Sequence, residues 1–512
     1  LVVAVLKCDV YYDENTNLWY WCNINNVWNK HIEPTLIKRL LSTLFVPLIN
    51  KQIHKWAKES MNIELDPDIR QRILNKTERA NKLITQLKLT SYMKNIKEYS
   101  FLFEKKDFYS DYIDSKSHLF AFTNKLFDFS LKKENGVLQD YIRYIRPDDY
   151  IQTTTGFAFP EYIETADEDT LKQYFIDLFP DLTKKDFVLD SFSTSLNGSN
   201  NEQYFNIHTG SGSNSKTTLM NLVSRSIGKY AVNISPETFT QPKKANSNGE
   251  LYKIKGKRLI VSNEPDDDNG SKLQTSMLKT LADESNQAII AKELYKNPIE
   301  IMNQTTLNLC MNNKPSLSTV DGGIGRRIRI IEYNVKFVDN PDENNINQKK
   351  LDPELISKMN SDNMRNTFIH MLLNNWINRV SKVSKIEVPE CIKLASSEYM
   401  ADCNSVLGFF GDVTNYEVTQ NSKDKVKSSE LFIVFKAWMK INKSDENMSD
   451  KKFKDYMLNI PGITVKRSNG MWYCGVKEII EDNTGPNGPH DYDDDDDEDD
   501  IDMRAARGPI RK

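Results

Sequence analysis

The fold of this 512-residue chain is best introduced by the stretch Gly210-Ser-Gly-Ser-Asn-Ser-Lys216-Thr217. The apolar run from Tyr204 to Ile207 precedes it, and a helical pattern from Leu219 to Val223 follows it. This order predicts a strand, a loop of small residues and the start of a helix. Small residues allow successive backbone N–H groups to turn toward one anion, and the helix N-terminus adds positive potential. The sequence therefore predicts a phosphate-binding loop within an α/β domain.

Every residue of this loop is a candidate contact for the phosphates of ATP, namely Gly210, Ser211, Gly212, Ser213, Asn214, Ser215, Lys216 and Thr217. Lys216 is expected to reach the β- and γ-phosphates, and the Thr217 hydroxyl is expected to bind Mg²⁺. Ser215 stands where the usual pattern has glycine, and serine enters the required conformation at more strain. A chance Gly/Ser-rich turn before a helix is the alternative interpretation.

Two further apolar runs end in polar residues. The run from Leu259 ends at Glu264, about fifty residues after the loop, where a carboxylate can polarise water and help hold the metal. Asp266 is a weaker helper, and an exposed acid after a core strand is the alternative. The run from Thr306 ends at Asn312, whose amide can sense the γ-phosphate and orient water. Asn-Asn before Lys-Pro also fits a simple turn.

Paired arginines follow in the stretch from Asp321 to Arg329. Arg326 and Arg327 lie just before an apolar run that starts at Ile328. An arginine in that place can point across a subunit boundary and stabilise transition-state charge in the neighbouring site. Contact with DNA phosphates is an equally weighted alternative.

Composition excludes several classes of protein. The chain has 68 Lys and Arg against 72 Asp and Glu, but ten of the acids lie between residues 491 and 502, so the remaining body is mildly basic and suits an anionic partner. No apolar run approaches the ~20 residues of a membrane helix. Six scattered cysteines without a Cys-x-x-Cys pair indicate a reducing compartment. We therefore expect an intracellular, soluble protein that does not contact a membrane.

The predicted fold class is multidomain α and α/β. Changes in composition and periodicity predict five segments. They are a mainly helical N-terminal domain at 1–160, a P-loop ATPase domain at 161–345, a helical connector at 346–400, a winged-helix-like domain at 401–480 and a disordered acidic tail at 481–512. Lysines near residue 452 and at the wing could touch DNA phosphates, or form only a solvated face.

The order of the motifs resembles the superfamily 3 helicases. It is most similar to the poxvirus-type primase-helicases of large DNA viruses and to related phage and plasmid primases. The matching text is GSGSNSKT, KRLIVSNEP, LKTLADESNQAIIAKELYKNPIEI, LNLCMNNKP and DGGIGRRIRIIEY, in that order. Ser215, Asn263 and the Ala282-Asp283 pair depart from the family pattern.

This resemblance implies an AAA+-like ATPase that works as a ring, expected to be a hexamer. ATP and Mg²⁺ would lie between subunits, with Arg327, or second Arg326, supplied by the neighbour. The other catalytic residues would be Lys216, Thr217, Glu264 and Asn312. The segment between the second and third strands corresponds to the family's pore hairpin, where Lys292, Tyr295 and Lys296 would contact DNA without reading its sequence.

The expected function is an ATP-dependent DNA helicase of viral DNA replication, the helicase portion of a primase-helicase, translocating on single-stranded DNA. The alternative is an ATP-dependent ring that loads or packages DNA without unwinding it. A small-molecule P-loop kinase is a third, weaker reading. Other replication proteins are possible partners, and the host cytoplasm or a viral replication site is the expected location. Asp66-Pro67-Asp68 reads as a helix-start turn, so any primase half is expected outside this chain.

Overall fold

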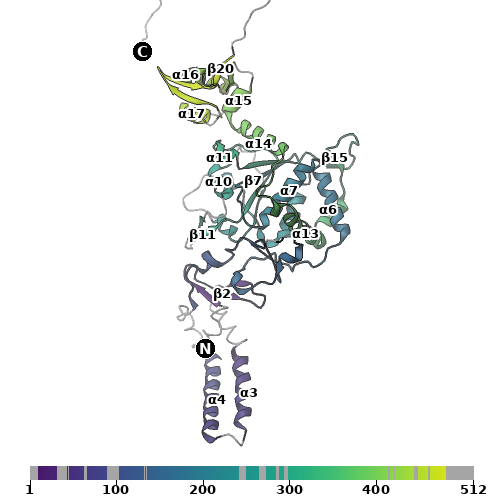
Figure 1. The fold of residues 1–512 in the computed structure, drawn as a ribbon, viewed down its shortest axis with the longest axis vertical. Coiled ribbons are helices and arrows are strands. Elements are labelled where there is room, and N and C mark those ends of the chain that lie inside the picture. The colour runs from purple at the N-terminus through teal and green to yellow at the C-terminus, as the bar shows by residue number, and fades with distance from the viewer. Residues whose placement is uncertain are drawn as a thin grey trace, which may run out of the picture. The chain divides into compact units, whose positions relative to one another are not determined.

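The structure is a computed structural model. It describes residues 10–31, 43, 45–62, 66–88, 103–131, 133, 135–240, 249–263, 272–283, 288–292, 298–412, 415–419, 421–442, 448–458, 460 and 462–479. The chain divides into two compact units (Figure 1). The first comprises 1–408 with 451–459, and the second comprises 409–450 with 460–512.

A five-stranded parallel sheet forms the centre of the first unit. Its strands lie in the order β13-β7-β12-β9-β8. The bounds are Phe205–Thr209 for β7, Ala231–Asn233 for β8, Leu259–Asn263 for β9, Thr306–Met311 for β12 and Ile328–Glu332 for β13. All four neighbouring pairs are parallel. The carboxyl ends of β7, β12 and β9 therefore lie side by side at one edge of the sheet, and this confirms the expected mixed α/β architecture around a parallel sheet.

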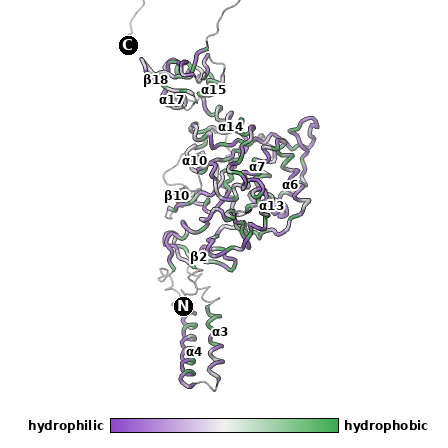
Figure 2. The backbone as a smooth tube through the Cα atoms, viewed as in Figure 1, coloured by the Kyte–Doolittle hydropathy of each residue, from purple (hydrophilic) through white to green (hydrophobic). Residues whose placement is uncertain are grey.

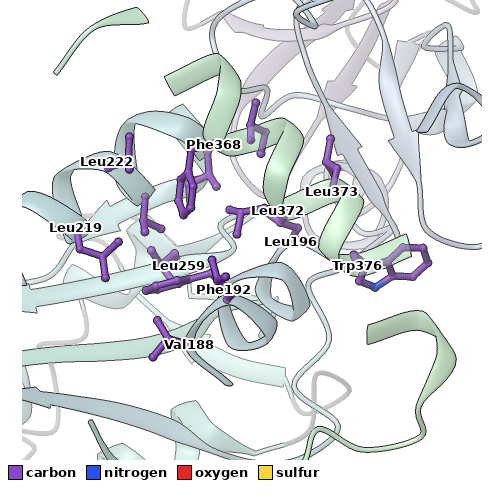
Figure 3. Packing of buried hydrophobic residues seen from close by; sticks show 14 of the residues in the cluster. Val188, Phe192, Leu196, Leu219, Leu222, Leu259, Phe368, Leu372, Leu373 and Trp376 are labelled. Carbon is purple, nitrogen blue, oxygen red and sulfur yellow. The ribbon is translucent and has the colours of Figure 1, made fainter. Parts of the chain in front are cut away.

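Helices cover the sheet, and most of its strand residues are buried. The main covering helices are α6 (Thr165–Leu178), α7 (Leu182–Leu196), α8 (Lys216–Ile227) and α13 (Asp362–Asn378). Figure 3 shows side chains of α7, α8 and α13 meeting Leu259 of β9 in one core. This packing fixes α8, and with it the loop that precedes α8.

Short elements surround the sheet in the first unit. They are α9 (Glu237–Thr240), α10 (Thr275–Ala282), α11 (Gly322–Gly325), α12 (Pro353–Met359), α14 (Glu390–Cys403), the antiparallel pair β10 (Ala288–Ala291) and β11 (Ile299–Met302), and the parallel pair β14 (Lys336–Val338) and β15 (Gln348–Lys350). Helix α15 spans Ser405–Gly411.

The N-terminal part combines sheets and helices. Strands β1 (Val10–Asp13), β2 (Leu18–Cys22) and β3 (Trp28–His31) form one antiparallel sheet, and β4 (Leu119–Ala121), β5 (Leu126–Asp128) and β6 (Ile142–Arg143) form another. The helices α3 (Val46–Ser60) and α4 (Pro67–Lys88) pack on each other. The expected helical character therefore applies to residues 46–88 and not to the strands on either side.

The second unit contains the antiparallel pair β16 (Tyr416–Val418) and β20 (Val476–Glu478), and the sheet β17-β19-β18. Strand β17 spans Lys425–Lys427, β18 spans Thr464–Arg467, β19 spans Met471–Cys474 and α16 spans Ser428–Asn442. Helix α17 spans Asp450–Leu458. The five segment boundaries and the winged-helix interpretation remain predictions, and the acidic tail lies outside the described residues.

Candidate nucleotide site

The loop between β7 and α8 has the backbone that an anion cradle requires. Gly212, Ser213 and Ser215 have φ angles of 89°, 48° and 60°. Alternation of left-handed and right-handed residues turns consecutive N–H groups toward one side of a loop. The side chains of Ser211 and Ser213 are exposed, whereas that of Asn214 is buried. The loop thus has three residues with positive φ just before α8, and the Gly212 N–H donates to Gly210 O at 3.0 Å within it.

Lys216 is buried at the first position of α8, with 7% of its surface exposed. Its Nζ donates to Met311 O at 2.6 Å, to Asn312 Oδ1 at 3.1 Å and to Gly210 O at 3.4 Å. The fold thus brings together Lys216 and Asn312, which are far apart in sequence. An ammonium group held by three oxygens at the carboxyl end of the sheet is in place to neutralise an anion in the loop.

Ser215, which stands where the usual pattern has glycine, is hydrogen-bonded to a tyrosine of α6. Ser215 is in the left-handed region, which costs a residue with a Cβ more than it costs glycine. The Tyr174 Oη of α6 lies 3.0 Å from Ser215 Oγ. Burial raises the pKa of Tyr174, so its hydroxyl stays protonated and can donate or accept in this pair. The Tyr174 hydrogen bond holds the strained serine in place of the missing glycine.

Gly210 is required by close packing. A Cβ at this position would press on the Asn214 side chain and lie 3.0 Å from Tyr333 O. Asn214 Oδ1 accepts the Lys216 N–H at 3.4 Å, and the Asn214 Nδ2 is buried without a hydrogen-bond partner among the described residues. A buried amide donor with no acceptor is costly, and an incoming anion would offer oxygens close to it.

The residues present fit a magnesium ion held mainly by substrate phosphates. Thr217 is exposed in the first turn of α8, one position beyond Lys216. Mg²⁺ commonly takes one or two protein oxygens and fills its other positions with water and phosphate. Among the described residues no group of three or more His, Cys, Asp or Glu side chains could hold a metal. The second expected ligand, Glu264, lies outside those residues, as does Asp266.

Strand β9, which directly precedes Glu264 in the sequence, is described up to its last residue. Strand β9 ends at Asn263, which pairs in register with Cys310 of β12. Glu264 follows directly in the sequence, and Asn312 follows Cys310 by two residues. The acid and the amide predicted from sequence therefore belong to neighbouring strand ends.

The two candidate arginines occupy different environments. Arg327 is buried and forms an ion pair with Asp283, which follows α10, and its Nη1 donates to Gly323 O at 2.9 Å. Arg326 is exposed at the end of α11. The turn is fixed by Asp321, which caps α11. Arg327 is thus bound within the chain, whereas Arg326 is exposed to solvent.

The candidate DNA-binding residues lie at the β10–β11 connection. Lys292 is exposed one residue after β10 ends. Tyr295 and Lys296 fall in the same connection but lie outside the described residues. The antiparallel pairing of β10 with β11 supports a hairpin here, and Lys292 is at its base.

Sequence reasoning missed a buried polar network beneath the loop. His208 of β7 is completely buried, with Nδ1 3.0 Å from Tyr333 Oη and Nε2 3.0 Å from Asn308 Oδ1. Asn206 Nδ2 donates to the same Asn308 oxygen at 3.0 Å. Burial lowers the pKa of His208 to about 4, so the imidazole is neutral. The sequence pattern that could have revealed this network is the alternation of polar Asn206 and His208 with apolar residues in the strand.

A second missed feature is a cavity of about 190 Å³ beside the loop. Ser213, Ser215 and Thr218 border it on the phosphate-loop side. Its other lining residues are mainly apolar and come from α6, β14, β15 and α12, and they are Tyr174, Phe337, Lys350, Leu351, Asp352, Leu355, Ile356 and Met359. A flat, mostly apolar ligand group attached to a phosphate chain would fit this arrangement.

Comparison with known proteins finds similarity to viral proteins named "Putative helicase" and "Putative primase". A family model described as "Family of unknown function (DUF5906)" matches residues 208–327, the stretch from β7 to Arg327. "Putative helicase L207/L206" of Acanthamoeba polyphaga mimivirus is 25% identical over 91% of this chain and 48% of its own length. "Putative primase C962R" of African swine fever virus is 29% identical over 39% of this chain and 21% of its own length.

A solved structure, the apo form of the NrS-1 C-terminal region, matches 93% of this chain and 98% of its own length, with 13% identity and a TM-score of 0.47. The chain spans about half or less of the length of the two viral relatives. No helix among the described residues combines the length and apolar character needed to cross a membrane. The sequence matches show that the chain is a distant homologue of proteins named as helicases and primases in large DNA viruses.

Proposed function

We propose that this chain hydrolyses ATP at the β7–α8 loop and uses the energy to separate DNA strands during viral DNA replication. The observation that carries the proposal is the contact of Lys216 Nζ with Met311 O and Asn312 Oδ1 at the carboxyl end of β12, and with Gly210 O after the neighbouring parallel strand β7. Ligands of open parallel sheets bind at this edge, beyond the carboxyl ends of the strands. A buried lysine, an amide and an anion-binding loop converge there.

The cavity beside the loop supports a nucleotide over a simple phosphate. Tyr174 and Phe337 provide aromatic surface, and Leu355 and Met359 provide aliphatic surface. Serines of the loop border the same cavity, so a base in it would be connected to phosphates in the loop. We assign the cavity to the base of the nucleotide.

The chemistry then follows from the residues around the loop. Lys216 would withdraw charge from the β- and γ-phosphates, and Asn312 would orient the attacking water. Glu264 would accept a proton from that water. Thr217 would hold Mg²⁺, which would supply positive charge to offset the negative charge of the phosphates.

A ring would complete the site. Arg327 forms an ion pair with Asp283 of the same chain. We therefore propose that Arg326 is the arginine supplied by a neighbouring subunit. In a hexameric ring, Lys292, Tyr295 and Lys296 would contact the DNA strand that passes through the pore. Hydrolysis at each boundary would move these residues along single-stranded DNA. The mimivirus relative, which carries the name helicase, supports this assignment.

Strand separation on a forked DNA substrate tests the proposal. The wild-type chain should release the displaced strand with ATP and should release none with a non-hydrolysable analogue. Lys292→Gln should slow release while DNA-independent hydrolysis stays unchanged. The exposed Lys336→Gln serves as a matched control that should behave as wild type. Hydrolysis and DNA binding without strand release would overturn the helicase proposal and favour the ring that loads or packages DNA.

A further inference from the structure

The helices α3 and α4 form a hairpin whose open end is anchored in the N-terminal sheet. Ile49, Leu83 and Leu87 pack into a small core with Val10 of β1 and Trp19 of β2. Ile53 and Trp56 of α3 are only half-buried, as is Ile73 of α4. The hairpin therefore has one apolar side where its helices meet, and most of its remaining surface faces solvent.

The hairpin is the basic segment of the protein body. Its two helices hold nine basic residues, which are Lys51, Lys55, Lys58, Arg70, Arg72, Lys76, Arg79, Lys82 and Lys88, and three acidic residues, which are Glu59, Asp68 and Glu78. The connection between the helices adds two acids, so residues 46–88 hold nine basic and five acidic residues. The tail at 481–512 holds four basic and twelve acidic residues, so 55 Lys and Arg and 55 Asp and Glu remain elsewhere. Apart from the tail and the hairpin, the chain is neutral.

Six of the nine basic residues form two stripes, one along a face of each helix. Lys51, Lys55 and Lys58 are spaced i, i+4 and i+7, so they share one face of α3. That face lies opposite the one that carries Ile53 and Trp56. On α4 the same spacing recurs in the stripe formed by residues 72, 76 and 79. Figure 2 shows hydrophilic residues predominating along α4.

The stripe residues lack the ion pairs that some helical lysines of the chain form. On α6, Lys172 pairs with Glu168, and on α14, Lys393 pairs with Glu390. On α4 itself, Lys82 pairs with Glu78. The six stripe residues are exposed and form no ion pair with the described residues. Their charges are therefore open to an anionic partner.

The length of each stripe suits a nucleic acid backbone. Each stripe runs over seven residue steps of its helix, or about 10 Å at 1.5 Å per residue. Duplex DNA carries one negative charge per about 1.7 Å of its axis, so several phosphates lie within that length. Exposed flexible cations bind phosphates without reading sequence.

We propose that the α3–α4 hairpin is a second DNA-binding surface, which binds the phosphate backbone independently of nucleotide. It shares with the proposed function the premise that DNA is the partner, but it requires neither ATP nor the β10–β11 connection. It would hold DNA near the ATPase while the pore residues step along one strand.

Fluorescence anisotropy of labelled DNA on the full chain, without nucleotide, tests this proposal. Lys51→Gln/Lys55→Gln/Lys58→Gln removes the α3 stripe, and Arg72→Gln/Lys76→Gln/Arg79→Gln removes the α4 stripe. Lys336→Gln/Lys382→Gln/Lys385→Gln removes the same charge from exposed positions elsewhere. Single-stranded and duplex probes, each titrated with salt, show which form of DNA binds. Thermal unfolding checks that the exposed substitutions leave the fold intact.

Each stripe variant should weaken binding at least tenfold. It should also lower the slope of log K against log salt by about two to three for duplex DNA, because about one counterion is released per phosphate contacted. The control should match wild type. Equal binding by stripe variants and control would overturn the proposal. A stripe variant that changes oligomer size without changing DNA affinity would also overturn it and assign the hairpin to a second copy of the chain.

The two proposals fail separately. Lys216→Ala should bind DNA as wild type does in this assay while losing hydrolysis. A stripe variant should keep its DNA-independent hydrolysis. If the stripe variants bind DNA as tightly as the control, while the wild type still hydrolyses ATP and releases the displaced strand, only the hairpin proposal is disproved.

Discussion

The buried wall of the nucleotide site and the exposed surfaces of the chain use charged residues in opposite ways. In the wall, Lys216 and His208 are almost completely buried and hydrogen-bonded, and Arg327 at the opposite edge of the sheet is likewise buried and paired with Asp283. On the surfaces, Arg326, Lys292 and the stripes of the α3–α4 hairpin are exposed. The first group has hydrogen-bond or ion-pair partners within the chain, whereas the second group is exposed to solvent. Replacing Arg327 or His208 should therefore damage stability, and replacing an exposed residue should damage function alone.

The largest predicted difference between a buried and an exposed residue is that between Arg327 and Arg326. Arg326→Ala should lower ATP hydrolysis by about a thousandfold, as expected for an arginine supplied in trans, with unchanged thermal stability. Mixing Arg326→Ala with Lys216→Ala chains should restore part of the hydrolysis, because each supplies what the other lacks at their shared boundary. Absence of restoration, with mixed oligomers demonstrated, would count against the trans assignment.

Arg327→Ala should instead destabilise the fold. It leaves Asp283 without its cation at a largely buried position, and breaking such a pair costs about 3 kcal/mol. Urea unfolding of the first unit measures this loss, with Arg326→Ala as the matched control. An Arg327→Ala chain that unfolds at the wild-type midpoint but cannot hydrolyse ATP would exchange the roles of the two arginines.

The pH dependence of stability isolates His208. Its pKa is lowered by burial to about 4 in the folded chain, whereas an unfolded histidine titrates near its ordinary value of about 6.5. Between these values the unfolded chain binds a proton that the folded chain does not, so stability falls as pH falls. At pH 5 the loss should reach about 2 kcal/mol relative to pH 7.

The difference between wild type and His208→Gln removes the contribution of the other histidines. Burial also lowers the pKa of His370 and His118, so the wild-type curve alone would mix three groups. The wild-type chain should lose more stability than His208→Gln between pH 7 and pH 5. Parallel curves would show that His208 is protonated or solvated in the fold.

The smallest expected effect concerns the support of Ser215. Tyr174→Phe should cost about 1 kcal/mol by removing the hydrogen bond to the serine. In the Ser215→Gly background the same substitution should cost much less, because the strained serine and its partner are already gone. Urea midpoints of the four chains measure the coupling, and the exposed Tyr162→Phe is the control. Additive effects would separate Tyr174 from the loop conformation.

Sequence predicted the parts of the site whose residues lie close together in the chain. The run from Phe205 to Thr217 contains a strand, a loop and a helix start, and local periodicity is enough to recognise them. The approach of Asn312 to Lys216 is explained by the parallel pairing of β7 and β12, whose carboxyl ends lie at one edge of the sheet. The roles of both residues remain predictions.

Other features depend on packing that no local pattern records. Arg327 is buried because Asp283 ends another helix beside it, and sequence alone does not separate Arg327 from Arg326. The base cavity forms only when α6, α12 and the β14–β15 pair meet the loop. The support of Ser215 by Tyr174 likewise joins residues 41 positions apart.

The most direct test of the ATPase site is the rate of ATP hydrolysis by the wild-type chain and by Lys216→Ala, each with and without single-stranded DNA. Asn221→Ala, an exposed change on the same helix, controls for damage to α8. The wild type and Asn221→Ala should hydrolyse ATP faster with DNA, and Lys216→Ala should fall at least about a thousandfold. Hydrolysis by Lys216→Ala at the wild-type rate would contradict the assignment of the β7–α8 loop as the catalytic site.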